Sequence, residues 1–234
     1  AYLKASRALW RRRLNYRRAR LRVARADKDP KRIDHWKQRV AQALAKVHRR
    51  DKQIADRQKA RGIDVSNNNG QINWAQVRKA GYRFAYLKAS EGIGFVDPDY
   101  ADNVKRARAA GLLVGAYHFL RPRAGRSGAS EADAFLSVVG HHHHDLRYTV
   151  DVEATDLGPD VMHVYVSQFV ERIVEQTRRH PLIYTYPAFT SWQSTHDCRL
   201  WIANYDVRQP TVPHPWTHYA IWQHSSTATV PGVS

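Results

Sequence analysis

The segment RYTVDVEATD, residues 147–156, places two carboxylates at the end of a short apolar run. Asp151 and Glu153 are two residues apart, and side chains alternate between the faces of a strand, so both point to the same side. At a rise of ~3.3 Å per residue, their backbone positions are about 6.6 Å apart. Burying carboxylates costs free energy unless they are paired or used in chemistry. The segment therefore predicts a functional acid pair.

Paired carboxylates of this kind suit the cleavage of a glycosidic bond. One of them must be protonated so that it can give its proton to the leaving oxygen, and the other stays ionised to stabilise positive charge on the sugar. Neighbouring carboxylates raise the pKa of one member, which produces this division of labour. The backbone separation does not decide between the ~5–5.5 Å carboxylate spacing of retaining enzymes and the ~6.5–9.5 Å spacing of inverting ones, so the stereochemistry stays open.

Two other functions fit the same acidic residues. Asp64, Asp151, Glu153 and Asp206 could bind Mg²⁺ for phosphoryl chemistry. Against a metal site, the sequence has no glycine-rich phosphate loop and no Lys near the carboxylates, and its 7 Trp and 12 Tyr suit sugar better than phosphate. We therefore expect neither a metal nor another cofactor. A catalytically silent carbohydrate-binding or virion structural module is the alternative from a different functional class.

Apolar strand-like runs alternate with helical patterns through residues 62–234. Strands are expected at 62–66, 83–90, 112–120, 147–154, 181–187, 199–206 and 218–226, and helices at 72–81, 97–111, 127–140 and 160–179. This alternation is typical of parallel strands joined by crossover helices. We expect five strand–helix units followed by loop-linked strands, which together form a barrel that closes irregularly.

Polar and aromatic residues gather at the expected carboxyl ends of these strands. In barrels and in open parallel sheets these ends lie on one side, where active sites form. The polar residues are Asp64, Ser90, Glu91, His118, Asp151, Glu153, Tyr184, Tyr186, Asp206, Gln223 and His224, and the aromatic rim adds Tyr117, Trp201, Tyr205 and Trp222. Three separate strands are therefore expected to deliver carboxylates to one sugar-lined groove.

The net charge of +17 lies entirely in the first quarter of the 234-residue chain. Residues 1–61 hold 22 Lys or Arg against 5 Asp, whereas residues 62–234 hold 16 basic and 16 acidic residues. We place a domain boundary between these two segments. No apolar run approaches the ~20 residues of a membrane span, and no signal peptide is visible because the first residues are too basic.

The basic segment has the pattern of an α-helical hairpin. Ile33, Val40, Val47 and Ile54 recur at intervals of seven, which is typical of a narrow apolar seam between packed helices. The stretch ADKDPK at residues 26–31 combines turn residues with a helix start, because Asp can cap and Pro fits the first turn. We expect two antiparallel helices that meet along this seam.

A hairpin with this charge has three interpretations. It is a solvated helical surface, an assembly element, or a binding surface for a polyanion. The charge exceeds what solubility needs, which favours an anionic wall polymer or an anionic membrane surface as the partner of residues 1–61. A nucleic acid is a less favoured partner that the Arg, Trp and Tyr content leaves open.

Three further candidates have simple structural explanations. The histidine run at residues 141–144 is expected to be a solvated loop, because consecutive side chains diverge whereas a structural zinc needs four converging ligands. His118 is expected to line the barrel and hold a carboxylate. Cys198 has no base nearby in the sequence and is expected to be inert, and as the single cysteine it excludes an internal disulfide.

Over nearly all of residues 62–234 the chain resembles glycoside hydrolase family 25, the Chalaropsis-type lysozymes, many of them phage endolysins. The resemblance rests on GIDVSNNNGQINW (62–74), YLKASEG (86–92), VDPDYADNVKRARAAGLLVGAYHFLRP (96–122), VDVEA (150–154), PLIYTYP (181–187), LWIANYD (200–206) and IWQHSS (221–226). The ordered set is highly specific, although no single piece would be.

The resemblance implies an irregular TIM-like (β/α)5β3 barrel and hydrolysis of the β-1,4 bond between N-acetylmuramic acid and N-acetylglucosamine in bacterial peptidoglycan, with retention of configuration. It implies that Glu153 is the general acid and that Asp151 acts as a nucleophile or steers the substrate's N-acetyl group. Asp64 and Asp206 are implied as supporting acids at the groove floor. The expected substrate-binding residues are Tyr86, Glu91, Tyr117, Tyr184, Trp201 and Gln223.

Some features depart from the family pattern. Family members usually continue past PG into a last strand that contains an Asp, whereas this chain stops at PGVS, residues 231–234, so we expect an eighth strand to be missing. Neither the basic hairpin nor the histidine run belongs to the usual pattern. The combination suggests a phage-encoded lysin that acts at the bacterial cell wall, from the host cytoplasm before lysis or as part of a virion.

Overall fold

The computed structural model describes residues 2–58, 60–189 and 197–233. The chain divides into two compact units, Ala1–Ala60 and Arg61–Ser234. Each unit has its own apolar cluster. Among the described helices, none is both long enough and apolar enough to span a membrane.

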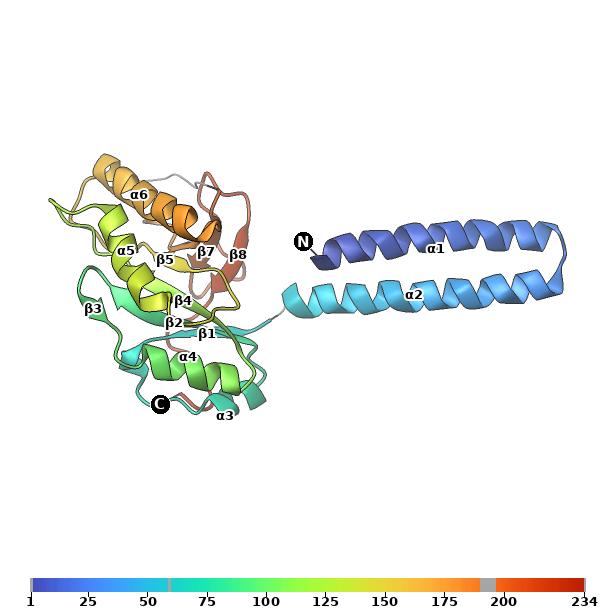
Figure 1. Ribbon diagram of the computed structural model, residues 1–234, viewed down its shortest axis with the longest axis horizontal. Helices are drawn as coiled ribbons and strands as arrows, with labels where there is room; N and C mark the ends of the chain where they lie inside the picture. Colours follow the sequence, from blue (N-terminus) through green and yellow to red (C-terminus); the bar gives the residue numbers. More distant parts are fainter. Residues whose placement is uncertain (1, 59, 190–196, 234) are drawn as a thin grey trace. The chain divides into compact units, whose positions relative to one another are not determined.

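The first unit is the predicted hairpin of two helices (Figure 1). Helix α1 spans Tyr2–Ala26 and helix α2 spans Pro30–Gln58. The chain reverses where the sequence predicts it: Asp29 precedes Pro30, and its carboxylate accepts a hydrogen bond from the backbone N–H of Arg32 at 3.1 Å. An aspartate cap and a proline in the first turn both favour a helix start at this point.

The apolar seam of the hairpin has a buried cluster at its centre. Leu14, Ala43 and Val47 are buried, and Trp10 and Val40 pack against them together with Leu44. The period of seven therefore predicts the buried face of α2 correctly. One member of the expected seam, Ile54, lies outside the described side chains.

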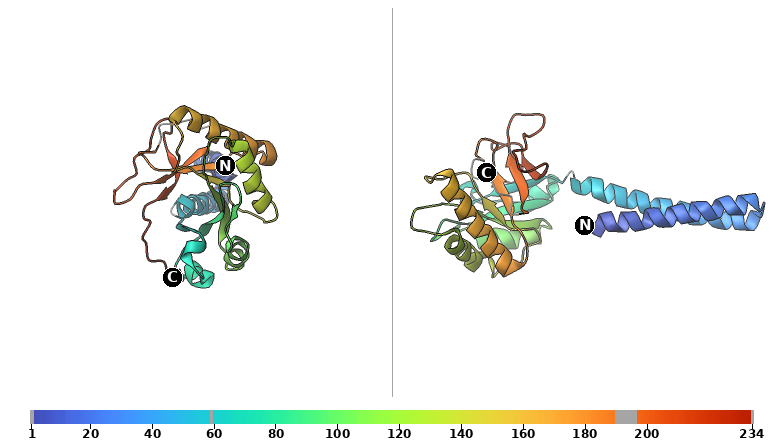
Figure 2. Two further views of the ribbon diagram at one scale, coloured as in Figure 1. Left: turned by 90° about the vertical axis from the view of Figure 1, so that its left-hand side faces the viewer. Right: turned by 90° about the horizontal axis from the view of Figure 1, so that it is seen from above.

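The second unit is a curled, mainly parallel sheet covered by helices (Figures 1 and 2). Its strands are β1 (Gly62–Val65), β2 (Phe84–Glu91), β3 (Phe95–Val96), β4 (Leu113–Phe119), β5 (Thr149–Asp151), β6 (Leu182–Thr185), β7 (Arg199–Ala203) and β8 (Tyr219–Gln223). Its helices are the 3₁₀ turn η1 (Asn67–Asn69), α3 (Trp74–Lys79), α4 (Tyr100–Ala109), α5 (Gly128–Val139) and α6 (Pro159–Thr177). The strand order is β1-β2-β4-β5-β6-β7-β8, with all of these neighbours parallel, and β3 pairs antiparallel with β2.

This architecture confirms the predicted mixed α/β, TIM-like class with a helical hairpin before it. Four strand–helix pairs precede β6, β7 and β8 in the described part of the chain. A fifth strand–helix unit, which we expected without placing its helix, would need a helix between β6 and β7, where residues 190–196 lie outside the described residues.

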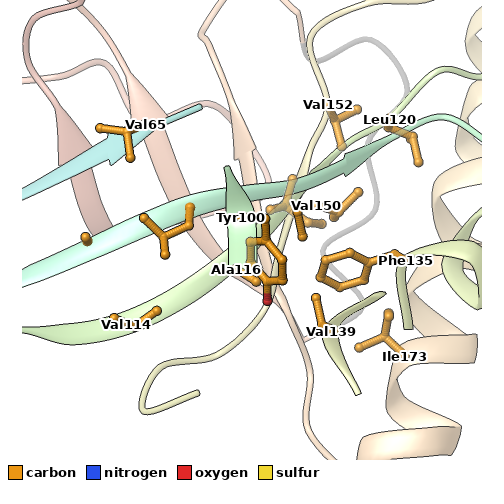
Figure 3. Packing of buried hydrophobic residues seen from close by; sticks show 14 of the residues in the cluster. Val65, Tyr100, Val114, Ala116, Leu120, Phe135, Val139, Val150, Val152 and Ile173 are labelled. Carbon is orange, nitrogen blue, oxygen red and sulfur yellow. The ribbon is translucent and has the colours of Figure 1, made fainter. Parts of the chain in front are cut away.

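Two apolar layers lie on opposite faces of the sheet. The larger one fills the space between the strands and helices α3 to α6, and Figure 3 shows Val114, Ala116 and Val150 of the strands facing Phe135 and Ile173 of the helices. The smaller one lies inside the curl and includes the side chains of Tyr86, Leu182, Tyr184, Trp201 and Ala203. Strand alternation thus sends every second residue inward, where a functional groove can form.

Helices α5 and α6 pack closely because of one glycine. A Cβ atom added at Gly128 would lie 1.8 Å from the backbone oxygen of Tyr165 in α6. The backbone N–H of Gly128 also donates to Oε1 of Gln168, at 3.1 Å. No other residue type fits there without moving α6, so Gly128 fixes the layer that supports β4 and β5.

Candidate active site

The carboxyl ends of the strands bring three acidic side chains together inside the curl. Asp64 lies in β1, Asp151 ends β5, and Glu153 follows two residues later. Their charges all act on Tyr117 of β4: burial raises the pKa of the Tyr117 hydroxyl well above its ordinary value, and the negative charges of these three carboxylates and of Asp97 raise it further. The structure therefore places the acidic groups at one site, as strand alternation predicts.

Gln223, at the end of β8, organises one side of this site. Its Nε2 donates to Oδ2 of Asp64 at 2.6 Å. Its Oε1 accepts hydrogen bonds from the hydroxyls of Tyr184, at 2.9 Å, and Tyr205, at 2.5 Å. Burial raises the pKa of Asp64, and the hydrogen bond from Gln223 partly opposes this rise. Gln223 thus holds an acid and two aromatic rings in fixed positions.

Asp151 is the most deeply placed member of the acid pair, with 7% of its surface exposed. Burial raises its pKa well above the ordinary value, and the charges of Glu153 and Asp64 raise it further. Among the described residues, its Oδ1 has no hydrogen-bond partner. A buried carboxylate oxygen without a partner is costly, so this atom is available to a bound ligand.

Glu153 is only half-buried and is the member of the pair that a substrate can reach. Burial raises its pKa and Asp64 adds to the rise, whereas the positive charges of Arg121 and Lys88 and a hydrogen bond with Tyr184 oppose it. Because Asp151 and Glu153 interact, they titrate as a pair, and the pair retains a proton above the usual carboxyl range. This arrangement suits proton donation by Glu153 beside a second carboxylate.

Lys88 is a site residue that the sequence reasoning missed. We expected no Lys near the carboxylates, yet the charge of Lys88 lowers the pKa of both Asp151 and Glu153. Lys88 lies opposite Tyr117 in the β2–β4 register, and strand alternation turns it inward. Alternation within the expected strand 83–90 was the signal that could have found it.

Glu91, an expected substrate-binding residue, is held in ion pairs at the rim. Its carboxylate pairs with Lys88 and accepts a hydrogen bond from Nε of Arg121 at 2.6 Å. Burial alone would raise the pKa of Glu91, but the hydrogen bonds from Lys88 and Arg121 bring it below the ordinary value. Glu91 is thus ionised and orients two cations beside the acid pair.

Three expected site residues are not placed as predicted. Tyr86 and Trp201 are 2% and 3% exposed, and their ring centroids are 4.7 Å apart in the interior of the curl. Both rings are therefore packed core residues and not open platforms for a sugar. Asp206 is exposed, three residues beyond β7, with a left-handed backbone (φ 55°), so it does not lie at a buried groove floor.

His118 holds a carboxylate, as expected, but it faces the helices and not the barrel interior. It is fully buried, with Nε2 2.9 Å from Oε1 of Glu131 and Nδ1 2.9 Å from Oγ of Ser90. Burial lowers the pKa of His118. Burial would raise the pKa of Glu131, but hydrogen bonds from His118, Tyr165 and the backbone N–H of Arg121 hold it below its usual value. A neutral His118 therefore donates to an ionised Glu131 and accepts from Ser90.

The remaining candidates do not form a second site. His144 is not simply solvated, because its Nε2 lies 2.6 Å from the Tyr100 hydroxyl and burial lowers its pKa to about 4. No group of three or more metal-binding side chains gathers in the part of the chain that the structure describes. Burial raises the pKa of the Cys198 thiol to about 12, which agrees with an inert cysteine.

Comparison with known families identifies the second unit. The family described as "Glycosyl hydrolases family 25" matches residues 63–233, which include the sheet except for Gly62 and all of the acidic residues of the site. The chain belongs to this family. The resemblance seen in the sequence motifs is thereby confirmed.

Relatives of known name and structure agree with this membership. Glycosyl hydrolase family 25 relatives include Lysozyme M1 of Streptomyces globisporus, which is 36% identical over 77% of this chain and 66% of its own length. The solved lysozyme of Streptomyces coelicolor is 36% identical, with a TM-score of 0.70 over 75% of this chain and 88% of that one. The CTP1L endolysin structure is 30% identical, with a TM-score of 0.63 over 73% of this chain and 62% of that one. The chain thus spans about two thirds of Lysozyme M1.

Proposed function

We propose that the chain is a peptidoglycan hydrolase, a lysozyme of the N-acetylmuramidase type. It would cleave the β-1,4 bond between N-acetylmuramic acid and N-acetylglucosamine and so lyse bacterial cell walls. The observation that carries the proposal is the convergence of Asp64, Asp151 and Glu153 around Tyr117 inside the sheet. Family membership and the similarity to Lysozyme M1 support the substrate class.

In the proposed reaction Glu153 gives its proton to the glycosidic oxygen of the leaving sugar. Asp151 lies on the same face of the strand and stabilises the positive charge that develops on the other sugar, by direct attack or by steering the N-acetyl oxygen. Water then breaks the bond so formed and releases the sugar, and the proton that the water loses returns to Glu153. Asp64, held by Gln223, adds negative charge that keeps the proton on the acid pair. The positive charge of Lys88 limits this effect, because it lowers the pKa of both Asp151 and Glu153.

The test of this function is digestion of purified peptidoglycan followed by chemical identification of the new reducing ends. Muramic acid ends support the proposal. Trapping of a fluorinated muramoyl sugar on Asp151, detected by mass spectrometry, would distinguish direct attack from steering of the N-acetyl group.

We propose that the hairpin of residues 1–60 binds an anionic polymer of the bacterial wall. Arg11, Arg18, Arg22 and Arg25 are all exposed, and their spacing of seven, four and three residues puts them along one stripe of α1. The acidic residues of the hairpin are few, and Asp27, Asp34 and Asp51 each form an ion pair within it. The excess positive charge is thus left for a partner of opposite sign.

Binding of the full chain to purified walls at increasing salt tests this proposal. Replacing the four stripe arginines by Gln should release the chain at lower salt, because each contact with an anionic group adds to the salt dependence. Replacing the exposed Leu9, Tyr16 and Val23 by Ser should change little. If only this second variant lost binding, apolar contacts such as those made with a membrane surface would be responsible instead. If the full chain bound DNA but not walls, the partner would be a nucleic acid.

We also propose that the chain acts as a phage-encoded lysin. Its similarity to the CTP1L endolysin supports this origin. Expression inside a susceptible bacterium, together with a protein that permeabilises the inner membrane, should lyse the cells. Intact cells after such co-expression would contradict the proposal.

A further inference from the structure

A hollow of about 360 Å³ opens at the ends of β2 and β4. Its walls come from the end of β2, the β2–β3 turn, β3 and the segment that follows β4. The lining residues are Glu91, Gly92, Ile93, Phe95, Arg121, Arg123 and Arg126. The end of β2 and the segment after β4 lie at the carboxyl ends of parallel strands, the ends at which Asp151 and Glu153 also lie, and the β2–β3 turn and β3 continue directly from β2.

The two sides of the hollow differ in chemistry. On one side, Arg121, Arg123 and Arg126 are exposed cations, and the single acid of the lining, Glu91, is already engaged by Lys88 and Arg121. On the other side, Ile93 and Phe95 leave 41% and 42% of their surfaces exposed. A ligand with carboxylates and small apolar groups therefore matches the hollow on both sides.

The hollow adjoins the catalytic strand directly. The backbone N–H of Leu120, which precedes Arg121, donates to the carbonyl of Asp151 at 2.9 Å. The Arg121 guanidinium lies over the Phe119 ring at 4.3 Å and is fixed by its hydrogen bond to Glu91. Its charge also lowers the pKa of Glu153, so the cationic wall reaches the proton donor electrostatically. Through Leu120 and Arg121 the hollow thus borders the strand that carries Asp151.

We propose that the hollow binds the acidic peptide carried by the muramoyl sugar, with its carboxylates on Arg123 and Arg126 and its small apolar side chains on Ile93 and Phe95. Arginine suits this role because its planar guanidinium binds carboxylates through two parallel hydrogen bonds. The inference rests on the proposed muramidase function, since only then does the cleaved bond place a peptide-bearing sugar beside Glu153. Arg121 acts as a positioning residue that is itself held by Glu91.

The experiment compares the full chain with its Arg123→Gln/Arg126→Gln variant on two soluble substrates: peptidoglycan fragments with intact peptides, and the same glycan chains after an amidase has removed the peptides. Both are freed of phosphate-bearing polymers. On intact fragments the KM of the variant should rise about tenfold with kcat unchanged, because exposed charge-assisted contacts contribute mainly to ground-state binding. On stripped glycan the two proteins should behave alike. Lys79→Gln/Lys105→Gln, two exposed cations on α3 and α4, is the matched charge control.

Equal KM values for the variant and the unaltered chain on intact fragments would overturn the proposal. So would an equal rise of KM on both substrates, because the arginines would then act on the glycan itself. A rise seen only on walls that keep their phosphate polymers would assign the hollow to phosphate. Failure of the proposed function is distinct from all of these results, since the unaltered chain would then release no muramic acid ends from either substrate.

Discussion

The side-chain amide of Gln223 in β8 donates a hydrogen bond to the carboxylate of Asp64 in β1, with 2.6 Å between Nε2 and Oδ2. Among the strands that the structure describes, no backbone pairing joins β8 to β1. This side-chain contact therefore spans the two ends of the curled sheet. It also connects Asp64 to Tyr184 and Tyr205, whose hydroxyls donate to the same amide.

Replacing Gln223 by Ala should lower both stability and activity. The change removes one hydrogen bond from the Asp64 carboxylate and one from the Tyr184 hydroxyl, and a buried polar group that loses its partner typically costs about 1–3 kcal/mol. Thermal unfolding should then occur about 2–4 °C lower for each 1 kcal/mol lost. Gln71→Ala, at an exposed position, is the control. An unchanged unfolding temperature would show that the sheet does not depend on this contact.

Replacing Asp151 by Asn should stabilise the chain while it abolishes activity. The folded pKa of Asp151 is raised, so the folded state becomes less favourable as pH rises from the unfolded value of about 4 through that raised pKa. Below pH ~4 both states are protonated and the substitution should have little effect. The gain in unfolding temperature should therefore appear at pH 7 and vanish near pH 3.5.

The control for this pH dependence is Asp156→Asn. Asp156 is exposed, in the segment between β5 and α6, so water solvates its carboxylate in the folded chain. The control should therefore leave the unfolding temperature nearly unchanged at both pH values. An equal gain from both variants at pH 7 would show that the loss of any negative charge stabilises the chain, and that burial of Asp151 is not the cause.

Replacing His118 by Gln should leave the shape of the pH–activity profile unchanged. His118 faces the helices and holds Glu131, so it takes no part in proton transfer at the acid pair. Glu131→Ala should lower stability by about 3–5 kcal/mol, because it breaks a buried charged network that also includes Tyr165. Loss of one limb of the profile in His118→Gln would contradict this placement.

Much of the architecture could be predicted because it depends on local patterns. Alternating strand and helix signals predict parallel strands, and parallel strands must present their carboxyl ends on one side. The convergence of Asp64, Asp151 and Glu153 follows from these rules alone. The hairpin followed in the same way from the spacing of Val40 and Val47 and from the turn at Asp29.

The errors arise where depth along a strand matters. Alternation indicates that Tyr86 and Trp201 face inward, but both stand mid-strand and so are packed below the groove. His118 follows the inward-facing Tyr117, so alternation indicates that His118 faces outward, as it does. Our expectation that it lines the barrel did not apply this rule. Asp206 lies beyond the end of β7, in a turn whose left-handed backbone no periodicity predicts.

Replacing Glu153 by Gln should lower kcat by about 10²–10⁴-fold while binding of peptidoglycan is retained, because the amide keeps the shape but cannot donate the proton. In the unaltered chain, activity should persist above the ordinary Glu pKa of about 4.3 and fall as pH rises through the raised pKa of Glu153. Glu171→Gln, on the exposed face of α6, is the matched control. Full activity of Glu153→Gln would remove Glu153 from the mechanism.

The chemical nature of the new reducing ends tests the central claim most directly. Purified peptidoglycan is digested with the full chain, the new ends are reduced with borohydride, and the products are identified by mass spectrometry. We predict muramic acid ends, absent when Glu153→Gln replaces the unaltered chain. Glucosamine ends, or cleaved peptides without new sugar ends, would contradict the account.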